Sequence, residues 1–162
     1  YGVAIDDKQA IYLSDFDRNE VRCYPPGRPD GILVAGGNGK GEALNQLNSP
    51  RDIFVDSQRS IYISDMHNHR VIKWMQDAKE GIVVAGGQGQ GSSGGQLSSP
   101  SGLLVDRTGS LFVVDQGNHR VVRWLPEATE GTVLVGGHAQ GSEPNQLHRP
   151  AGLQLDENNH LC

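Results

Sequence analysis

The sequence has few of the residues that would point to several kinds of function. Only two cysteines, Cys23 and Cys162, occur in 162 residues, and they lack the short spacing of a metal site. They neither require nor exclude an oxidising compartment. No apolar run approaches the roughly eighteen residues that span a membrane, and no basic-then-apolar leader opens the chain. We therefore expect no membrane insertion.

The chain also has fewer basic than acidic residues. The chain carries 14 Lys and Arg against 19 Asp and Glu, a formal net charge of -5. An acidic chain lacks the field that draws a nucleic-acid backbone or an anionic bilayer as a bulk property. Nucleic-acid binding is therefore disfavoured, although a local basic patch stays open as an alternative.

Glycine is abundant, with 22 residues, and the sequence repeats itself at an interval of 50. The second and third units agree at about 21 of 50 positions. We predict repeats at approximately 1–50, 51–100 and 101–150, with a partial fourth unit at 151–162. The columns that carry the repeat are Asp6, Asp56, Asp106 and Asp156; Asp15, Asp65 and Asp115; Tyr24, Trp74 and Trp124; and Pro50, Pro100 and Pro150.

Each unit contains four short runs rich in β-branched and aromatic residues, which is typical of a four-stranded antiparallel meander. In the third unit these runs are 102–105, 110–115, 120–125 and 131–136. Both faces of the strands are apolar, so both must be covered. With no helices to cover them, neighbouring sheets must do so, and radially stacked four-stranded sheets form a β-propeller. The sequence predicts an all-β propeller.

The stretch from Pro100 to Val121 resembles the NHL repeat, in the pattern P-x-G-L-x-V-D-x-x-G-x-L-x-V-x-D-x-x-N-H-R-V. The resemblance covers essentially the whole chain and implies a six-bladed ring, of which about three and a half blades are present. The first unit departs from the pattern, with Arg18, Asn19 and Glu20 at the corner. We interpret the chain as a segment of a longer propeller, with a half-ring that dimerises as the alternative. Uncovered end blades predict self-association of the isolated chain.

A corner motif recurs between the second and third strands, as DMHNHRVIKW at 65–74 and DQGNHRVVRW at 115–124. It is either a reactive constellation or fold chemistry. Because it recurs in successive units and a catalytic centre is needed once, we predict a structural role. The aspartate accepts backbone N–H groups and the arginine supplies a bidentate partner, while Asn68 and Asn118 take a positive φ. The predicted structural residues are Asp15, Asp65, Arg70, Asp115 and Arg120.

Three other features have a functional and a structural interpretation. His67, His69 and His119 could hold a metal, but rotation between units separates them, so we predict solvent-facing turn residues and no metal site. The Gly-rich loops at 36–50, 86–100 and 136–150 precede strands rather than helices, which disfavours phosphate binding. Their Gln-Leu and final Pro predict a clip, with the leucine buried and the glutamine bonded to backbone. The Trp column predicts core packing rather than a ligand platform.

The long loops and the corners leave an antiparallel meander at the same end, so we expect them to share one face. Loops held by a rigid scaffold are the usual place for recognition. The predicted partner-binding residues there are Lys40, Glu42, Met66, His67, His69, Gln116, His119, His138, Glu143, His148 and Arg149.

These observations favour a non-enzymatic scaffold for a protein or peptide partner, with no cofactor and no catalytic residue. The resemblance implies two alternatives. Similar propellers include a peptide-amidating lyase and, more distantly, calcium-dependent lactonases, with catalytic groups around the central axis. The inner strands here read VAI, IFV, LLV and LQL, in which Gln154 is the only polar side chain. An enzyme would therefore need its catalytic site in other blades. Some relatives of this kind bind RNA, which the acidic balance disfavours.

Overall fold

The computed structural model describes residues 2–138 and 140–156, and this part of the chain is built from strands and tight turns. The strands are β1 Val3–Ile5, β2 Ile11–Asp15, β3 Glu20–Tyr24, β4 Ile32–Gly36, β5 Pro50–Val55, β6 Ile61–Asp65, β7 Arg70–Trp74, β8 Ile82–Gly86, β9 Pro100–Val105, β10 Leu111–Asp115, β11 Arg120–Trp124 and β12 Thr132–Gly136. Two single 3-10 turns, Met66–Asn68 and Gln116–Asn118, join β6 to β7 and β10 to β11. The prediction of an all-β chain is confirmed.

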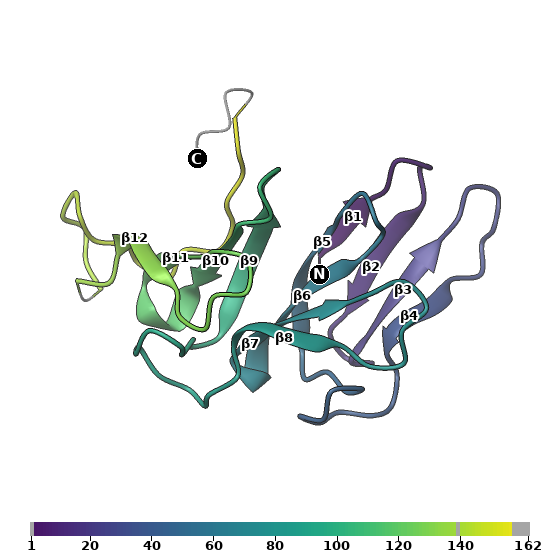
Figure 1. Ribbon diagram of the computed structural model, residues 1–162, viewed down its shortest axis with the longest axis horizontal. Coiled ribbons are helices and arrows are strands. Elements are labelled where there is room, and N and C mark those ends of the chain that lie inside the picture. Colours follow the sequence, from purple (N-terminus) through teal and green to yellow (C-terminus); the bar gives the residue numbers. More distant parts are fainter. Residues whose placement is uncertain (1, 139, 157–162) are drawn as a thin grey trace.

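The strands form three four-stranded antiparallel sheets. Sheet 1 is β1-β2-β3-β4, sheet 2 is β5-β6-β7-β8 and sheet 3 is β9-β10-β11-β12, each in sequence order. Figure 1 shows them fanned side by side from sheet 1 in purple to sheet 3 in green. The predicted meanders are therefore confirmed. The innermost strand of sheet 3 begins two residues earlier than predicted, because Pro100 pairs with Asp115 across a register shift.

A repeated turn joins the first and second strands of each sheet. In sheet 3 the Asp106 Oδ1 accepts the backbone N–H of Thr108 at 2.8 Å and of Ser110 at 2.9 Å. Gly109 closes this turn with φ of 84°, a conformation that costs glycine little. The Asp-to-Gly spacing in the sequence therefore corresponds to a turn held by the aspartate side chain itself.

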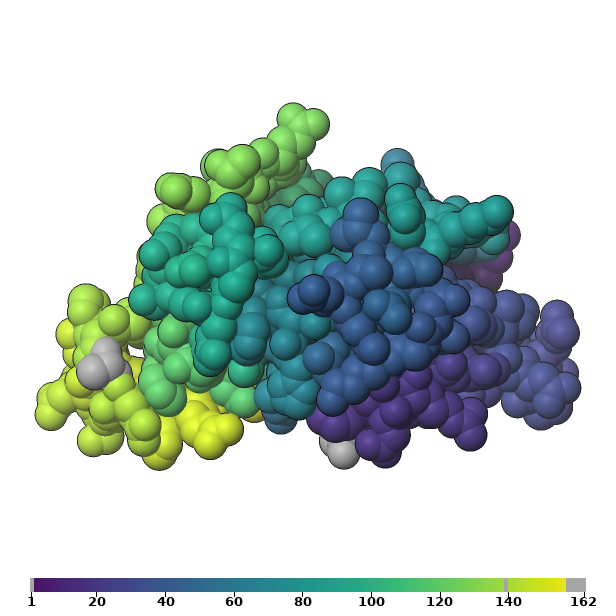
Figure 2. Space-filling model, turned by 90° about the horizontal axis from the view of Figure 1, so that it is seen from below, coloured from purple at the N-terminus to yellow at the C-terminus, as the bar shows by residue number. Residues whose placement is uncertain are grey.

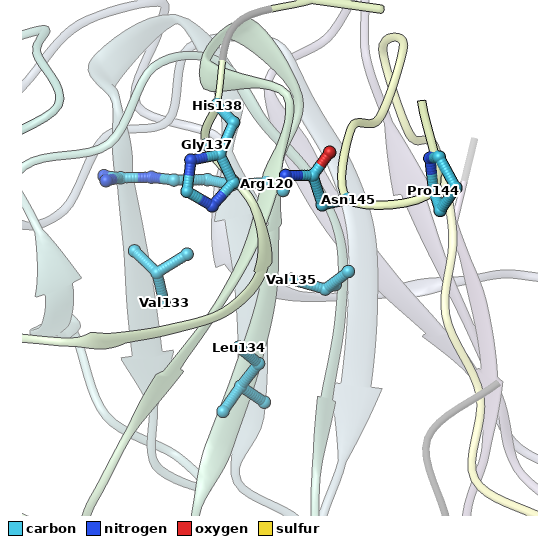
Figure 3. Close-up of a pocket in the computed structure, with 9 residues that line it drawn as sticks. Arg120, Val133, Leu134, Val135, Gly137, His138, Pro144 and Asn145 are labelled. Carbon is cyan, nitrogen blue, oxygen red and sulfur yellow. The ribbon is translucent and has the colours of Figure 1, made fainter. Parts of the chain in front are cut away.

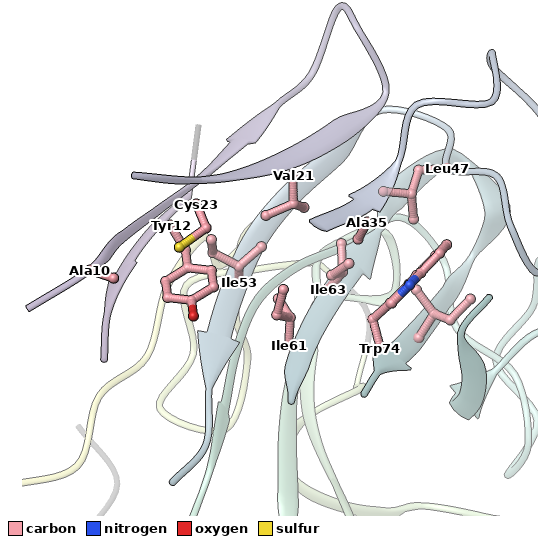
Figure 4. Packing of buried hydrophobic residues seen from close by; sticks show 11 residues of the cluster. Ala10, Tyr12, Val21, Cys23, Ala35, Leu47, Ile53, Ile61, Ile63 and Trp74 are labelled. Carbon is pink, nitrogen blue, oxygen red and sulfur yellow. The ribbon is translucent and has the colours of Figure 1, made fainter. Parts of the chain in front are cut away.

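The hydrophobic core lies between the sheets. One cluster joins Tyr12, Val21 and Leu47 to Ile63 and Trp74 of sheet 2, as Figure 4 shows. A second cluster repeats this contact between sheets 2 and 3, where Trp124 is only 2% exposed. The predicted burial between sheets is confirmed for Trp74 and Trp124 and for the clip leucines Leu47 and Leu97. Tyr24, on the free face of sheet 1, and Leu147, in the third loop, are only partly buried.

The outer face of sheet 1 is apolar and uncovered, and that of sheet 3 is covered only in part, since Val114 and Val121 are buried there while Leu134 and Val135 are 41% and 38% exposed. On the free face of sheet 1, Val3 is 60% and Ile11 is 41% exposed, whereas the equivalent Ile53 and Ile61 of sheet 2 are buried. Along β12, the edge strand of sheet 3, a hollow of about 570 Å³ runs past Val133, Leu134 and Val135 to His138 and Asn145 (Figure 3). Both faces have the chemistry of an inter-sheet contact.

The described residues contain no helix long and apolar enough to cross a membrane.

Candidate functional site

The corner of sheet 2 fastens the loop that leads into this sheet. The Arg70 Nε donates to Asp65 Oδ2 at 2.8 Å, and Asp65 Oδ1 accepts the Asn48 backbone N–H at 2.7 Å. Both side chains are buried, with Asp65 at 0% and Arg70 at 5% exposed. The remaining guanidinium N–H groups donate to loop carbonyls, at Glu42 (2.7 Å), Ala43 (3.1 Å) and Gln46 (3.0 Å). This charge pair is buried away from water, and backbone groups of the loop supply hydrogen-bond partners to both of its members.

The corner of sheet 3 repeats this bonding pattern. The Arg120 Nε donates to Asp115 Oδ2 at 2.7 Å, and Asp115 Oδ1 accepts the Ser98 N–H at 2.7 Å. Arg120 also donates to two carbonyls of the second long loop, at Ser92 (2.9 Å) and Gln96 (3.2 Å). The ion pair therefore uses the Nε atom, and the guanidinium ends bind the loop rather than forming the expected bidentate pair.

The corner of sheet 1 is built differently. Asp15 is half-exposed and accepts the N–H groups of its own turn, from Asp17 at 3.1 Å and Arg18 at 2.9 Å. Glu20 takes the arginine position and pairs with Arg22 at 2.6 Å. A carboxylate cannot donate to loop carbonyls, so this corner has no counterpart of the Arg70 and Arg120 contacts.

The prediction that Asn68 and Asn118 adopt a positive φ is wrong. The left-handed residues are His69 with φ of 51° and His119 with φ of 53°, because each ends a 3-10 turn. The Asn68 Nδ2 instead donates to Asp65 Oδ2 and to the Gly41 carbonyl, both at 2.8 Å. The asparagine is therefore a further fastening between corner and loop.

His69 and His119 are not simple solvent-facing residues, which corrects the second expectation for this turn. Each ring is half-buried and accepts, at Nδ1, the backbone N–H of the last residue of the long loop that follows its sheet: Ser99 at 3.0 Å for His69 and Arg149 at 3.0 Å for His119. In sheet 1, Asn19 Oδ1 accepts the Ser49 N–H at 2.8 Å in the same way. These side chains bind each sheet to the end of the long loop that follows it.

The His69 bond predicts a pH dependence of stability. Burial, and then the neighbouring His67, lower the pKa of His69 below its ordinary value of 6.5. The unfolded chain therefore binds a proton as the pH falls through 6.5 while the folded chain does not, so the free energy of unfolding decreases below that pH. The variant His69→Asn keeps an acceptor, as Asn19 shows, but cannot titrate.

Urea unfolding of both proteins between about pH 5 and pH 7.5 measures this effect. We expect the wild type to lose stability relative to His69→Asn as the pH falls below 6.5. Parallel curves over this range would contradict the proposed bond.

The long loops and the corners meet at one end of the sheets, and together they form the loop face. The long loops span 37–49, 87–99 and 137–149, with residue 139 outside the described part. In Figure 2, which views the molecule from below, the blue first loop and the teal second loop lie toward the viewer. The glutamines of the predicted clips are bonded to backbone as expected, since Gln46, Gln96 and Gln146 each donate to a carbonyl of their own loop at 3.0 to 3.1 Å.

The structure gathers four of the predicted partner-binding residues into one groove. A groove of about 280 Å³ lies at the junction of sheets 2 and 3. It is lined by Met66, Ser99, Gln116, Gly117, His119, Gln140 and Arg149. His148 adjoins it, with its ring centroid 6.2 Å from that of His119. The other predicted residues do not line this groove: His67 contacts the Phe16 ring, His69 binds Ser99, and Lys40, Glu42, His138 and Glu143 are exposed on the loops.

Two charged residues on the innermost strand of sheet 2 were missed by the sequence interpretation. The Arg51 Nη1 lies 3.5 Å from Gln116 Oε1 and 3.9 Å from Met66 Sδ. Asp52 accepts the Leu103 N–H at 3.1 Å, and burial raises the pKa of this carboxyl. The signal was present in the repeat, because Asp52 occupies a column where the other units have Gly2, Gly102 and Gly152.

No three His, Cys, Asp or Glu side chains among residues 2–138 and 140–156 come together as ligands for a metal ion.

The known structures that resemble this chain are β-propellers. They include a protein of unknown function from Bacteroides thetaiotaomicron, with a TM-score of 0.75, 15% identity, and coverage of 94% of this chain and 41% of that chain. A chain of a nidogen/laminin complex gives a TM-score of 0.73 at 20% identity, covering 99% and 54%. A streptogramin B lyase gives 0.68 at 15% identity, covering 99% and 46%. At these identities the likeness establishes the fold alone.

The three sheets are therefore propeller blades, and the propeller prediction is confirmed. The chain spans about half the length of the chains that it matches. No protein-family model matches the sequence, and the search of the curated proteins found no match.

Proposed function

We propose that this chain is a segment of an NHL-type, six-bladed propeller that serves as a non-enzymatic scaffold and binds a protein or peptide through its loop face. The NHL assignment is supported by the Asp-x-x-Asn-His-Arg corner, whose four motif side chains each have a bonding role in sheets 2 and 3. The repeats are proposed at about 1–50, 51–100, 101–150 and 151–162, of which residues 157–162 lie outside the described part.

The observation that supports the scaffold function is that the repeated and the variable residues of the loop face have different roles. The repeated residues, Asp65 and Arg70 and their equivalents, are buried and bonded to the chain itself. The residues that differ between units, such as Lys40, Glu42 and Glu143, are exposed on the loops. A rigid scaffold with variable exposed loops is suited to recognition. A chain of a nidogen/laminin complex is among the structural neighbours, which agrees with a protein partner.

Two charge-reversal variants test this proposal. One exchanges charges on the loop face, with Lys40→Glu and Glu143→Lys together. The matched control, Asp7→Lys with Lys8→Glu, exchanges charges at an exposed turn joining β1 to β2 at the opposite end of sheet 1 and leaves the net charge the same. Proteins cross-linked to the immobilised wild type should also be cross-linked to the control but lost with the loop-face variant. Loss with the control alone would refute the proposal.

A metal-dependent enzyme is the second candidate, and Asp52 favours it. This carboxyl lies on an innermost strand, and burial raises its pKa. Perturbed carboxyl groups of this kind occur at catalytic sites. A streptogramin B lyase shares the fold. A metal retained through purification, together with a fall in melting temperature on adding a chelator, would support this candidate over the scaffold.

We also propose that the isolated chain associates through the free faces of sheets 1 and 3. Val3 and Ile5 of sheet 1 and Val135 of sheet 3 are 38% to 60% exposed there. Contiguous apolar surface of this kind marks a contact site.

A further inference from the structure

The groove between sheets 2 and 3 exists because two residues depart from the preceding junction. Between sheets 1 and 2, Phe16 and His67 occupy the corresponding positions, and their ring centroids lie 6.1 Å apart. Between sheets 2 and 3 these positions are Met66 and Gly117, and both residues line the groove. At the junction where the groove lies, a flexible thioether and a hydrogen atom therefore stand in place of the two rings.

The same junction has gained positive charge. Arg149 lines the groove at a repeat position where the first two units have Ser49 and Ser99. A second arginine, Arg51, places Nη1 3.9 Å from Met66 and 3.5 Å from Gln116. None of the seven lining residues is acidic. The acid next to Arg51 in sequence, Asp52, accepts the Leu103 N–H at 3.1 Å.

Arg149 and His119 supply hydrogen-bond donors at the groove. His119 accepts the Arg149 N–H at Nδ1, so the neutral ring carries its proton on Nε2. The Gln116 Oε1 is engaged by Arg51, and its Nε2 donates to the Pro150 carbonyl at 3.2 Å. A guanidinium and an imidazole N–H at the rim of a small groove match a carboxylate, which only accepts hydrogen bonds.

We infer that this groove binds an Asp or Glu side chain of a protein partner, with Arg149 as the principal contact and Arg51 as supporting charge. The inference rests on the proposed scaffold function and names the chemistry that the loop face recognises. A peptide carboxylate fits better than nucleic acid for two reasons. No Phe, Tyr or Trp side chain lines the groove, and the chain has a net charge of -5, which opposes a phosphate backbone that carries a charge at every nucleotide.

The repeat supplies a conservative test variant. Arg149→Ser introduces the residue that stands at the equivalent positions 49 and 99, where serine also has a positive φ, of 57° and 51°. The backbone N–H that binds His119 is therefore retained. The matched control is Arg107→Ser, at an exposed turn at the opposite end of sheet 3.

Fluorescence anisotropy with labelled peptides measures the binding. The probes are an alternating Glu-Gly peptide, its Gln-Gly counterpart of equal length, and a single-stranded RNA. We expect the full chain to bind the Glu-Gly peptide about tenfold or more tightly than the Gln-Gly peptide, and less tightly as salt is added. Arg149→Ser should remove this preference and Arg107→Ser should retain it.

Three results would overturn the inference: equal binding of the Glu and Gln peptides, a preference that persists in Arg149→Ser, or tighter binding of the RNA. The capture experiment with Lys40→Glu and Glu143→Lys is independent of these residues. If loop-face capture succeeds while the peptide preference is absent, the scaffold stands and the acidic specificity fails.

Discussion

Replacing Asp115 with alanine should lower the free energy of unfolding by about 3 to 5 kcal/mol, because it leaves the charge of Arg120 buried without its partner. Asp115 is 0% exposed and also accepts the Ser98 N–H at 2.7 Å and an Asn118 N–H at 2.7 Å. These donors would lose their acceptor as well, and unsatisfied buried donors add to the loss. Urea unfolding monitored by tryptophan fluorescence gives the difference.

The matched control is Asp15→Ala, at the same repeat position in sheet 1. The Asp15 side chain is 40% exposed and its arginine contact is a loose 3.8 Å. We expect this change to cost less than about 1 kcal/mol. Equal losses at the two positions would show that the loop fastening seen in sheet 3 contributes nothing.

The second large effect is expected at Trp124. Its side chain is 2% exposed and packs in the cluster that joins sheets 2 and 3. Truncation to alanine leaves a large cavity, so Trp124→Ala should cost about 3 to 5 kcal/mol in unfolding free energy.

Tyr24 provides the comparison, since it holds the same repeat position on the free face of sheet 1 and is only partly buried. Tyr24→Ala should cost clearly less than Trp124→Ala in the same urea titration. A loss below about 1 kcal/mol for Trp124→Ala would place the indole on the surface rather than between sheets.

The strands and their stacking could be predicted from the sequence because the signal is repeated. Four β-branched runs per unit predicted four strands, and apolar residues on both faces predicted coverage by neighbouring sheets. Asp65, Arg70 and their equivalents were placed at the corners for the same reason, since a residue that recurs in each unit serves what each unit has in common.

The details of the corners could not be predicted because they depend on segments distant in sequence. The Arg70 guanidinium binds carbonyls 24 to 28 residues away, and His69 accepts an amide 30 residues away. Local turn preferences favour asparagine at a position with positive φ. In the structure, His69 has the positive φ instead, and its ring makes the bond to the distant Ser99 amide. The groove between sheets 2 and 3 could not be predicted either, because it depends on which side chains of two neighbouring sheets lie against each other.

Arg51 and Asp52 were missed for a different reason. From the sequence, only the apolar run of each innermost strand was considered. In the second unit this run begins at Ile53, one residue after Asp52. The strand β5 starts at Pro50, so both charged residues belong to it. A charge in a column otherwise occupied by glycine was visible in the alignment of the units and identifies the position without a structure.

The central claim is that each sheet has apolar faces built to be covered by another sheet. Sedimentation equilibrium of the isolated chain tests it most directly, with Ile11→Lys as the comparison, since Ile11 is 41% exposed on the free face of sheet 1. The account predicts that the wild type associates with increasing concentration and that Ile11→Lys shifts the equilibrium toward a folded monomer. A compact wild-type monomer at all concentrations would contradict it.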